Sequence, residues 1–557
     1  MSSNINQQFR RATLLCALLL LACTGALAQQ ESPFRSIAYH LEMSHPASHL
    51  FEVSIHVELN ASLDHVDFQM PRWSPGRYAV FDFAKNVQEF KAFSALRHLN
   101  GNEEVQFVST RLPVVRVDDQ TWRVETMGNQ AVNIIYKVFA DDLSGTFSQL
   151  DERHADFNGG SVFMYVVDHK QDPVSLSITP PQNWRVINGR TKTIGEHEWQ
   201  FPNYDIMIDT PTEIGPDWTM DQFEVGGKTY RVVVHSFGSE GGKRPELVRG
   251  IERIVRAETA MWGAPEFDSY TFLIHFAPGI TGGDGMEHLN STQIIQAGAL
   301  ADAGWLNHAL ATIAHEFFHV WNVKRLRPAE LGPWDFTRPL ATRNLWIAEG
   351  LTNYYGTLML RRAGITTDEQ LIRSYSETID RVENSPGSRL MSAEEASLSA
   401  PFLDRAVHAQ RTNLANTSVS YYIKGEVLGL VLDLMIRGKT QGRASLDDVM
   451  RRMYEEFYVN GQKTTYYLHG HGYTGEDFER VASEVAGINL HDFFERYVRG
   501  TETPPYDDAL AFVGLRLVRQ NRPGQNRAEY HIEDTQVLSH PALTQRRAWL
   551  NGSPSQP

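Results

Sequence analysis

The stretches that decide the fold of this chain are His315-Glu316-Phe317-Phe318-His319 and, later, Trp346-Ile347-Ala348-Glu349. In a helix, residues four apart share one face, so His315 and His319 can direct two imidazole nitrogens to one metal ion, about 2.0–2.1 Å from zinc. Glu316 lies beside them, where its carboxylate can take a proton from bound water. The first stretch therefore predicts a metal-binding helix.

The surroundings of this helix favour a metal over a pair of ordinary buried histidines. The preceding run Leu306–Ala314 is apolar on the side that carries the histidines. Without an ion, Glu316 would be buried with no cationic partner, which is costly. Glu349 follows His319 by 30 residues within a stretch rich in large apolar side chains. A buried carboxylate needs a metal or a base, so we expect Glu349 to be the third ligand.

Three protein ligands leave one coordination position open, as in catalytic rather than structural zinc sites. This arrangement predicts one Zn²⁺ ion and hydrolysis through metal-bound water, with Glu316 as general base. Cobalt or manganese could occupy the same ligands, since availability as well as affinity sets metal choice. Asn353, one turn after Glu349, is a candidate for orienting a ligand, and an ordinary surface asparagine is the alternative.

Composition excludes some classes of partner. The 557 residues carry 52 basic and 67 acidic side chains, for a formal charge of −15. This charge disfavours nucleic acids and anionic membranes, and the length indicates two or three domains. No run after the N-terminus is apolar enough for a membrane span. The oligomeric state is not readable from the sequence.

The N-terminus predicts export. Arg10 and Arg11 precede an apolar run, and Ala26-Leu27-Ala28 resembles a cleavage site, so we expect residues 1–28 to be a signal peptide and the mature protein to be periplasmic or secreted. Cleavage would remove both cysteines, Cys16 and Cys23. The alternative is a lipid anchor at Cys23 at the cell envelope, because the residues before it loosely resemble a lipobox.

Sequence periodicity divides the rest of the chain. Alternating apolar residues predict a β-sandwich-like domain over 31–225. Strands near 230–234 and 270–274 flank a helix over 246–262, and helices dominate from 305, including 306–323, 340–362, 368–382, 419–437, 446–457 and 475–485. The fold class is thus multidomain α+β, with a catalytic domain over 226–502 and a short tail over 503–557.

Several motifs together resemble the glycyl aminopeptidase family of gluzincin zinc metallopeptidases. They are Trp73-Ser74-Pro75-Gly76-Arg77-Tyr78, Gly285-Met286-Glu287-His288, the zinc helix running into Trp321-Asn322-Val323-Lys324-Arg325, the stretch around Glu349, and Tyr421-Tyr422-Ile423-Lys424-Gly425. The resemblance implies an N-terminal β domain followed by a thermolysin-like catalytic domain. It also implies zinc ligation by His315, His319 and Glu349, with Glu316 as base.

The resemblance implies further site residues. Gly285, Met286 and Glu287 look like the exopeptidase strand, in which the glutamate binds the free α-amino group of a substrate. Tyr422 occupies the position of the tyrosine that hydrogen-bonds the oxyanion, with Tyr421 as the alternative. The family often ends in a PDZ domain, and the residues after 505 allow at most a remnant near 513–517 and 530–532.

These observations predict a zinc aminopeptidase that removes N-terminal residues, such as Gly or Ala, from peptides with a free N-terminus. Two alternatives stay open. One is an endopeptidase on the same scaffold, and the other is a non-catalytic peptide-binding protein that contains zinc. The presence of Glu316 and of an open coordination position argues against the second.

Overall fold

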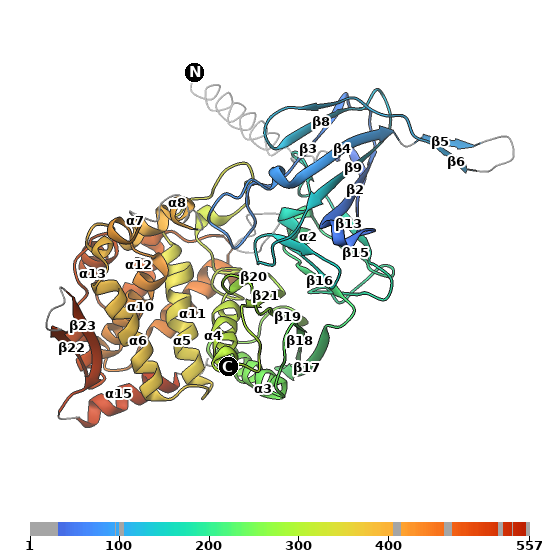
Figure 1. Ribbon diagram of the computed structural model, residues 1–557. Helices are drawn as coiled ribbons and strands as arrows, with labels where there is room; N and C mark the ends of the chain where they lie inside the picture. The colour runs from blue at the N-terminus through green and yellow to red at the C-terminus, as the bar shows by residue number, and fades with distance from the viewer. Residues whose placement is uncertain are drawn as a thin grey trace, which may run out of the picture.

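The computed structural model describes residues 32–94, 96–99, 105–404, 414–461, 471–521, 527–536 and 539–552. The expected signal peptide over 1–28, with Cys16 and Cys23, lies outside these residues. In the described part of the chain, no helix combines the length and apolar character needed to cross a bilayer. The fold is a β-rich N-terminal region followed by a mixed region and then a helical one, as expected for the α+β class (Figure 1).

The N-terminal region is built from three sheets around one core. The six-stranded sheet has the order β15(Glu198–Phe201), β13(Val174–Thr179), β1(Phe34–Glu42), β2(Leu50–Leu59), β9(Ala131–Phe139) and β4(Val87–Ser94). The two four-stranded sheets are β10(Ser148–Leu150), β11(Ala155–Phe157), β16(Thr212–Gly215) and β14(Arg185–Asn188), and β12(Tyr165–Val166), β3(His65–Gln69), β8(Thr121–Glu125) and β7(Val114–Arg116). Strand β2 alternates buried and half-buried residues along its whole length, which is the two-residue period that predicted it.

Smaller elements complete this region. The two-stranded ribbon β5(Leu96–Leu99) and β6(Val105–Val108) projects from it, and the short helix α2(Tyr204–Ile208) lies within it, against β13 and β15 (Figure 1). Side chains of the three sheets and of the loop around Trp334 and Phe336 share one buried cluster. The loop after the metal-binding helix therefore packs into the N-terminal core.

A five-stranded sheet begins the second region. Its order is β17(Thr219–Val225), β18(Lys228–Ser236), β19(Ser269–Phe276), β21(Ser291–Gln296) and β20(Asp284–Glu287). Strand β20 forms the edge and pairs antiparallel to β21, whereas β18, β19 and β21 are parallel. Because β17 pairs with β18, this sheet starts before residue 226, where the sequence had placed the boundary.

Helices dominate the rest of the described chain, together with one that lies between β18 and β19. They are α3(Arg244–Trp262), α4(Trp305–Phe318), α5(Leu351–Arg362), α6(Asp368–Glu383), α7(Ala393–Leu398), α8(Ala400–Leu403), α9(Leu414–Thr417), α10(Tyr421–Lys439), α11(Leu446–Tyr454), α12(Gly475–Ala486), α13(His491–Phe493), α14(Tyr506–Ala511) and α15(His540–Asn551). Single π-helical turns lie at Trp346–Gly350, Glu455–Val459 and Phe494–Val498.

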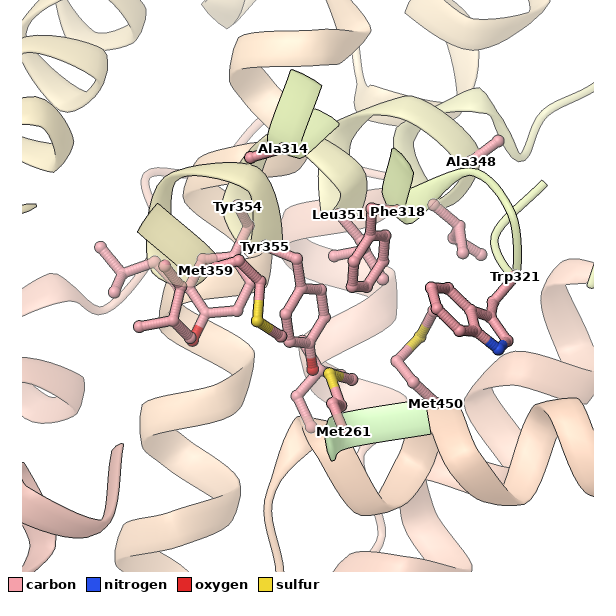
Figure 2. Packing of buried hydrophobic residues seen from close by; sticks show 14 of the residues in the cluster. Met261, Ala314, Phe318, Trp321, Ala348, Leu351, Tyr354, Tyr355, Met359 and Met450 are labelled. Carbon is pink, nitrogen blue, oxygen red and sulfur yellow. The ribbon is translucent and has the colours of Figure 1, made fainter. Parts of the chain in front are cut away.

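The core of the helical region lies directly behind the metal-binding helix. Figure 2 shows Phe318 and Trp321 packing among Tyr355, Met450 and Met261. The rings of Phe318 and Tyr355 stack with centroids 4.7 Å apart. Rigid aromatic packing of this kind fixes the position of the helix, and so of the histidines on its other side.

The residues after 503 are not a separate tail. Strands β22(Leu515–Asn521) and β23(Ala528–Asp534) form a hairpin near the positions where strand-like pieces were expected, and β23 packs against α6. Helix α15 returns to α5, where Trp549 is 1% exposed and its indole Nε1 donates to Tyr354 Oη at 3.0 Å. These elements share the main core with the catalytic helices.

Candidate metal centre and active site

The two histidines of the motif converge as their spacing predicts. His315 and Glu316 lie in the last turn of α4, which ends at Phe318 rather than near 323 as expected. His319 still has right-handed helical dihedral angles, so the i, i+4 relation to His315 is kept. The two Nε2 atoms lie 3.0 Å apart, and His319 is 1% exposed.

Glu349 meets both histidines from the π-helical turn Trp346–Gly350. Its Oε2 lies 3.3 Å from Nε2 of His315 and 3.3 Å from Nε2 of His319. Two ligands at 2.0–2.1 Å from a tetrahedral zinc ion are themselves about 3.3 Å apart. The three atoms thus have the mutual spacing of three corners of a zinc tetrahedron, and these residues fit the ion.

A carbonyl group holds the ring of His319 in this orientation. Nδ1 of His319 donates to the backbone oxygen of Asn322 at 2.7 Å, which leaves Nε2 free to face Glu349. The Asn322 side-chain amide donates to the carbonyl of Ile347 at 3.0 Å and to Thr352 Oγ1 at 3.1 Å. Asn322 therefore connects the segment after the zinc helix to the turn that carries Glu349. Asn353, the expected candidate for this role, instead lines the cleft.

A residue of the N-terminal region also contacts the ligand set. The Tyr78 hydroxyl donates to Oε1 of Glu349 at 2.5 Å. This bond leaves Oε2 facing the histidines and fixes the carboxylate, as groups behind metal ligands commonly do. The sequence placed Tyr78 in one of the motifs that carry the family resemblance, but no local pattern connects it to a glutamate 271 residues away.

Glu316 and Glu287 lie side by side next to the ligands. Each offers a carboxylate oxygen, and these atoms and a ring nitrogen of His319 all lie within 4.8 Å of one another. Burial raises the pKa of Glu316 well above its usual range, and Glu287 adds to this effect while His319 opposes it. A carboxyl group with a raised pKa is suited to hold a proton and pass it on.

Strand β20 brings Gly285, Met286 and Glu287 against the zinc helix. A Cβ on Gly285 would lie 2.1 Å from Oε1 of Glu316, so any side chain there would displace the Glu316 carboxyl group. On the other side, Met286 and Glu287 are 0% and 4% exposed, because Gly76 packs onto them. A Cβ on Gly76 would lie 2.3 Å from the sulfur of Met286 and 2.9 Å from a Glu287 oxygen, and its φ of 89° also favours glycine.

The two candidate tyrosines differ in position. Tyr422 lines a cleft of about 820 Å³ together with His315 and Glu316, and its ring centroid lies 6.2 Å from that of His315. Tyr421 is 3% exposed and makes an edge contact with Tyr78 behind the ligands. Tyr422, and not Tyr421, therefore lies on the cleft wall.

Electrostatics match this cleft to cations. Glu287, Glu316 and Glu349 place three carboxyl groups in one buried cluster. The nearby Arg77 pairs with Asp284, with 2.5 Å between Nη2 and Oδ2. A divalent metal ion would offset the negative charge of this cluster, which buried carboxylates require.

The comparisons with known proteins agree with this geometry. Residues 38–216 match the model of the peptidase M61 N-terminal domain, and residues 308–428 match that of the M61 glycyl aminopeptidase. No match was found among the curated proteins.

Two solved structures are similar to this chain, and the first of them has the same overall fold. An aminopeptidase N family protein from Idiomarina loihiensis has 27% sequence identity and a TM-score of 0.76, over 88% of this chain and 80% of that one. An M1 zinc metallopeptidase from Deinococcus radiodurans has 14% identity and a TM-score of 0.47, over 85% of this chain and 95% of that one.

The resemblance stated from the sequence motifs is thereby confirmed. The two family models match in the expected order and together cover more than half of the chain. Their limits enclose His315, Glu316, His319 and Glu349, the residues that the structure brings together. This chain is a metallopeptidase that belongs to the M61 glycyl aminopeptidase family.

Proposed function

We propose that the protein is a zinc aminopeptidase that binds one ion and releases small N-terminal residues, such as Gly or Ala, from peptides. The observation that carries this proposal is the buried carboxyl group of Glu287, which has an oxygen within 4.8 Å of a carboxylate oxygen of Glu316 and a ring nitrogen of His319. A free α-amino group is an ammonium ion at neutral pH and needs such an anion. Beside the metal ligands, this anion would fix the first peptide bond at the reacting position.

The contact between the two regions supports exopeptidase rather than endopeptidase action. The loop that carries Gly76 and Arg77 packs directly on β20, and Gly145 approaches Met286 from the same region. A peptide whose amino group lies at Glu287 would have no room to extend past this wall. Trp305, His308 and Tyr422 line the cleft, in which we propose that the rest of the peptide lies.

Each residue of the site then has a role in hydrolysis. When bound by His315, His319 and Glu349, zinc supplies positive charge that polarises the scissile carbonyl and acidifies water. Glu316 takes one proton from water as the new C–O bond forms, and it delivers this proton to the amine nitrogen as the C–N bond breaks. The hydroxyl of Tyr422 donates a hydrogen bond to the carbonyl oxygen as negative charge develops on it.

The preference for small residues rests on two supports. The matched family model is described as that of a glycyl aminopeptidase. In addition, Gly76, Arg77 and Met286 crowd the region around Glu287, which leaves little space for a large first side chain.

A panel of aminoacyl anilides tests the proposal. We expect turnover of Gly- and Ala-anilides, at least about tenfold lower kcat/KM for Leu- and Phe-anilides because each large side chain costs more than 1.4 kcal/mol of binding, and none for N-acetyl-Ala-anilide. Chelation should abolish turnover and zinc should restore it. Equal turnover of the acetylated and free substrates would instead indicate an endopeptidase.

Glu316→Gln tests the assignment of the base. The variant should retain zinc, because Glu316 is not a ligand, and should lose about 10²–10⁴-fold in kcat. Metal content measured on the same sample separates loss of the base from loss of the ion. Undiminished turnover would refute the role of Glu316.

A further inference from the structure

A second cluster of metal-ligating side chains lies between the N-terminal region and the five-stranded sheet. Asp156 of β11 and Glu213 of β16 are register partners on neighbouring strands of one sheet. His235 of β18 and His275 of β19 are register partners on neighbouring strands of the other. All four side chains are at most 2% exposed. Packing of the two sheets therefore brings two carboxyl groups and two imidazoles into one buried space.

The ligand atoms of this cluster point at one another. Glu213 Oε1 lies 2.5 Å from Nδ1 of His235, and Glu213 Oε2 lies 2.8 Å from Nε2 of His275. One ligand atom from each of these three residues lies within 4.8 Å of the others, the same criterion that the catalytic residues His315, His319 and Glu349 meet. Two imidazoles and a carboxylate form a ligand set typical of divalent transition metals.

The other polar atoms of the cluster are arranged as they would be around a metal ion, rather than as in a simple Glu–His ion pair. The other ring nitrogen of His235, Nε2, lies 2.9 Å from Oδ1 of Asp217, the contact by which proteins orient a ligating histidine. If Nε2 of His235 carries the proton, Nδ1 presents a lone pair to Glu213, and a cation between the two removes the repulsion. Asp156 Oδ2 has no hydrogen-bond partner among the described residues and lies 4.0 Å from Nε2 of His275.

Aromatic rings enclose the cluster. The His154 ring lies 5.1 Å from that of His235 and 5.8 Å from that of His275, and Phe237 stacks on His235 at 4.6 Å. A dry enclosure strengthens the attraction between a cation and its ligands. It also makes two adjacent carboxylates costly unless positive charge accompanies them.

We propose that His235, His275 and Glu213, with Asp156 as a fourth ligand, bind a second divalent transition-metal ion such as zinc. Since the carboxylates come from the N-terminal region and the histidines from the catalytic sheet, this ion would connect the two. Its role is structural, because four protein ligands leave no open position for a substrate. The site is distinct from the one formed by His315, His319 and Glu349 and does not depend on the proposed substrate.

Metal counting on the full-length protein tests the proposal. Wild type should hold about two equivalents of zinc per chain after removal of weakly bound metal. His315→Ala/His319→Ala should hold about one and lack turnover. His275→Gln should also hold about one equivalent of zinc but keep turnover. Glu213→Gln is a second variant of the same site, and it should behave in the same way because glutamine keeps the shape of the glutamate side chain.

Two outcomes would overturn the proposal. One is that wild type holds a single equivalent of zinc per chain and that His315→Ala/His319→Ala holds none. This outcome can be measured even if His275→Gln fails to fold. The other is His275→Gln with the same metal content as wild type. A thermal melt adds an independent readout: chelation should lower the Tm of His315→Ala/His319→Ala, and it should leave that of the same variant carrying Glu213→Gln unchanged.

Discussion

Tyr78 shows how a single residue of one region can tune the site of another. Its hydroxyl donates to Glu349 at 2.5 Å, and the carboxylate would otherwise be free to turn in its pocket. Tyr78→Phe removes the hydrogen bond while keeping the ring, so we expect zinc affinity to fall about 10–100-fold. Competition with a chromogenic chelator measures this. Tyr39→Phe is a matched control, since its hydroxyl donates to the Met164 carbonyl far from the ligands. Equal zinc affinity in Tyr78→Phe and Tyr39→Phe would contradict the assigned role.

Glu426 has an effect on stability rather than on catalysis. Burial raises its pKa to about 7, although hydrogen bonds from Thr378 and Thr357 oppose this. The folded pKa exceeds the unfolded value, so the native state loses stability as pH rises through about 4.5 to 7, by about 3 kcal/mol. Glu426→Gln should lack this contribution to the pH dependence of stability and should be more stable than wild type at pH 8. Urea unfolding at pH 5 and 8 checks this, with the exposed Glu495→Gln as control. If the unfolding free energy of Glu426→Gln changes between pH 5 and pH 8 as much as that of wild type, Glu426 is not the source of this pH dependence.

At the residue scale, the sequence predicted those members of the site that depend on local spacing. His315 and His319 are four apart on one helix, and Glu316 follows from the same motif. Glu349 could be placed because a carboxylate among large apolar residues needs a cation. Tyr78 and the carbonyl of Asn322 could not, because their roles arise from tertiary contacts and leave no periodic pattern in the sequence.

At the scale of elements, the approach of α10 to the π-helical turn at Trp346–Gly350 positions two parts of the site. Gly350 and Gly425 face each other so closely that a Cβ on Gly425 would lie 2.5 Å from the Trp346 carbonyl and 2.7 Å from the Gly350 Cα. This contact sets the distance between Glu349, on the turn, and Tyr422, on the helix. The two glycines are therefore needed because they allow this close approach of the backbones, and not because they make the chain flexible.

Gly425→Ala should separate these elements. Because the clash is with backbone, side-chain rotation cannot relieve it, and we expect a destabilisation of about 1–3 kcal/mol together with loss of zinc affinity and kcat. Val431→Ala, a cavity variant on the same helix, should lower stability without changing zinc affinity. Chemical denaturation and chelator competition on both proteins check this. Normal zinc binding in Gly425→Ala would show that the contact does not set the ligand geometry.

Element ends were harder to predict than element types. The 3.6-residue apolar period located the helices over 246–262, 368–382 and 475–485 to within two residues. It extended the zinc helix too far and missed the π-helical turn that carries Glu349. Periodicity reports the buried face of a helix, whereas a turn with one extra residue is imposed by neighbouring backbone such as that of Gly425.

At the scale of the whole molecule, both regions contribute to the active site. Lys324, which follows the zinc helix, donates to Asp209 of the N-terminal region at 3.0 Å, and His288 contacts the same carboxyl group at 3.1 Å. Burial would raise the pKa of Asp209, but Lys324 and His288 lower it below its usual range. Arg77 also lines the cleft, so the N-terminal region is part of the cleft wall. Composition and alternation predicted its sheets but could not show which face meets the zinc helix.

The C-terminal residues complete the fold in a similar way. Helix α15 was expected to belong to a short tail, yet Trp549 is 1% exposed, its ring stacks near Tyr375, and its indole donates to Tyr354. Tyr354 follows Glu349 on the adjoining helix α5. The chain end therefore supports the helix that continues from the metal-binding turn, and a sequence of only 12 residues gives no sign of this long-range packing.

Trp549→Ala tests this support. Removing a fully buried indole leaves a cavity and deletes the hydrogen bond that Tyr354 Oη accepts, while its bond to Asp433 remains, so we expect a loss of about 3–5 kcal/mol in the free energy of unfolding. Phe402→Ala, at a side chain that is 67% exposed, should change it by less than about 0.5 kcal/mol. Unfolding in urea gives both values, and zinc content at low temperature should stay that of wild type, because Trp549 does not contact a ligand. A Trp549→Ala protein as stable as Phe402→Ala would mean that the packing of α15 adds nothing to the stability of the catalytic core.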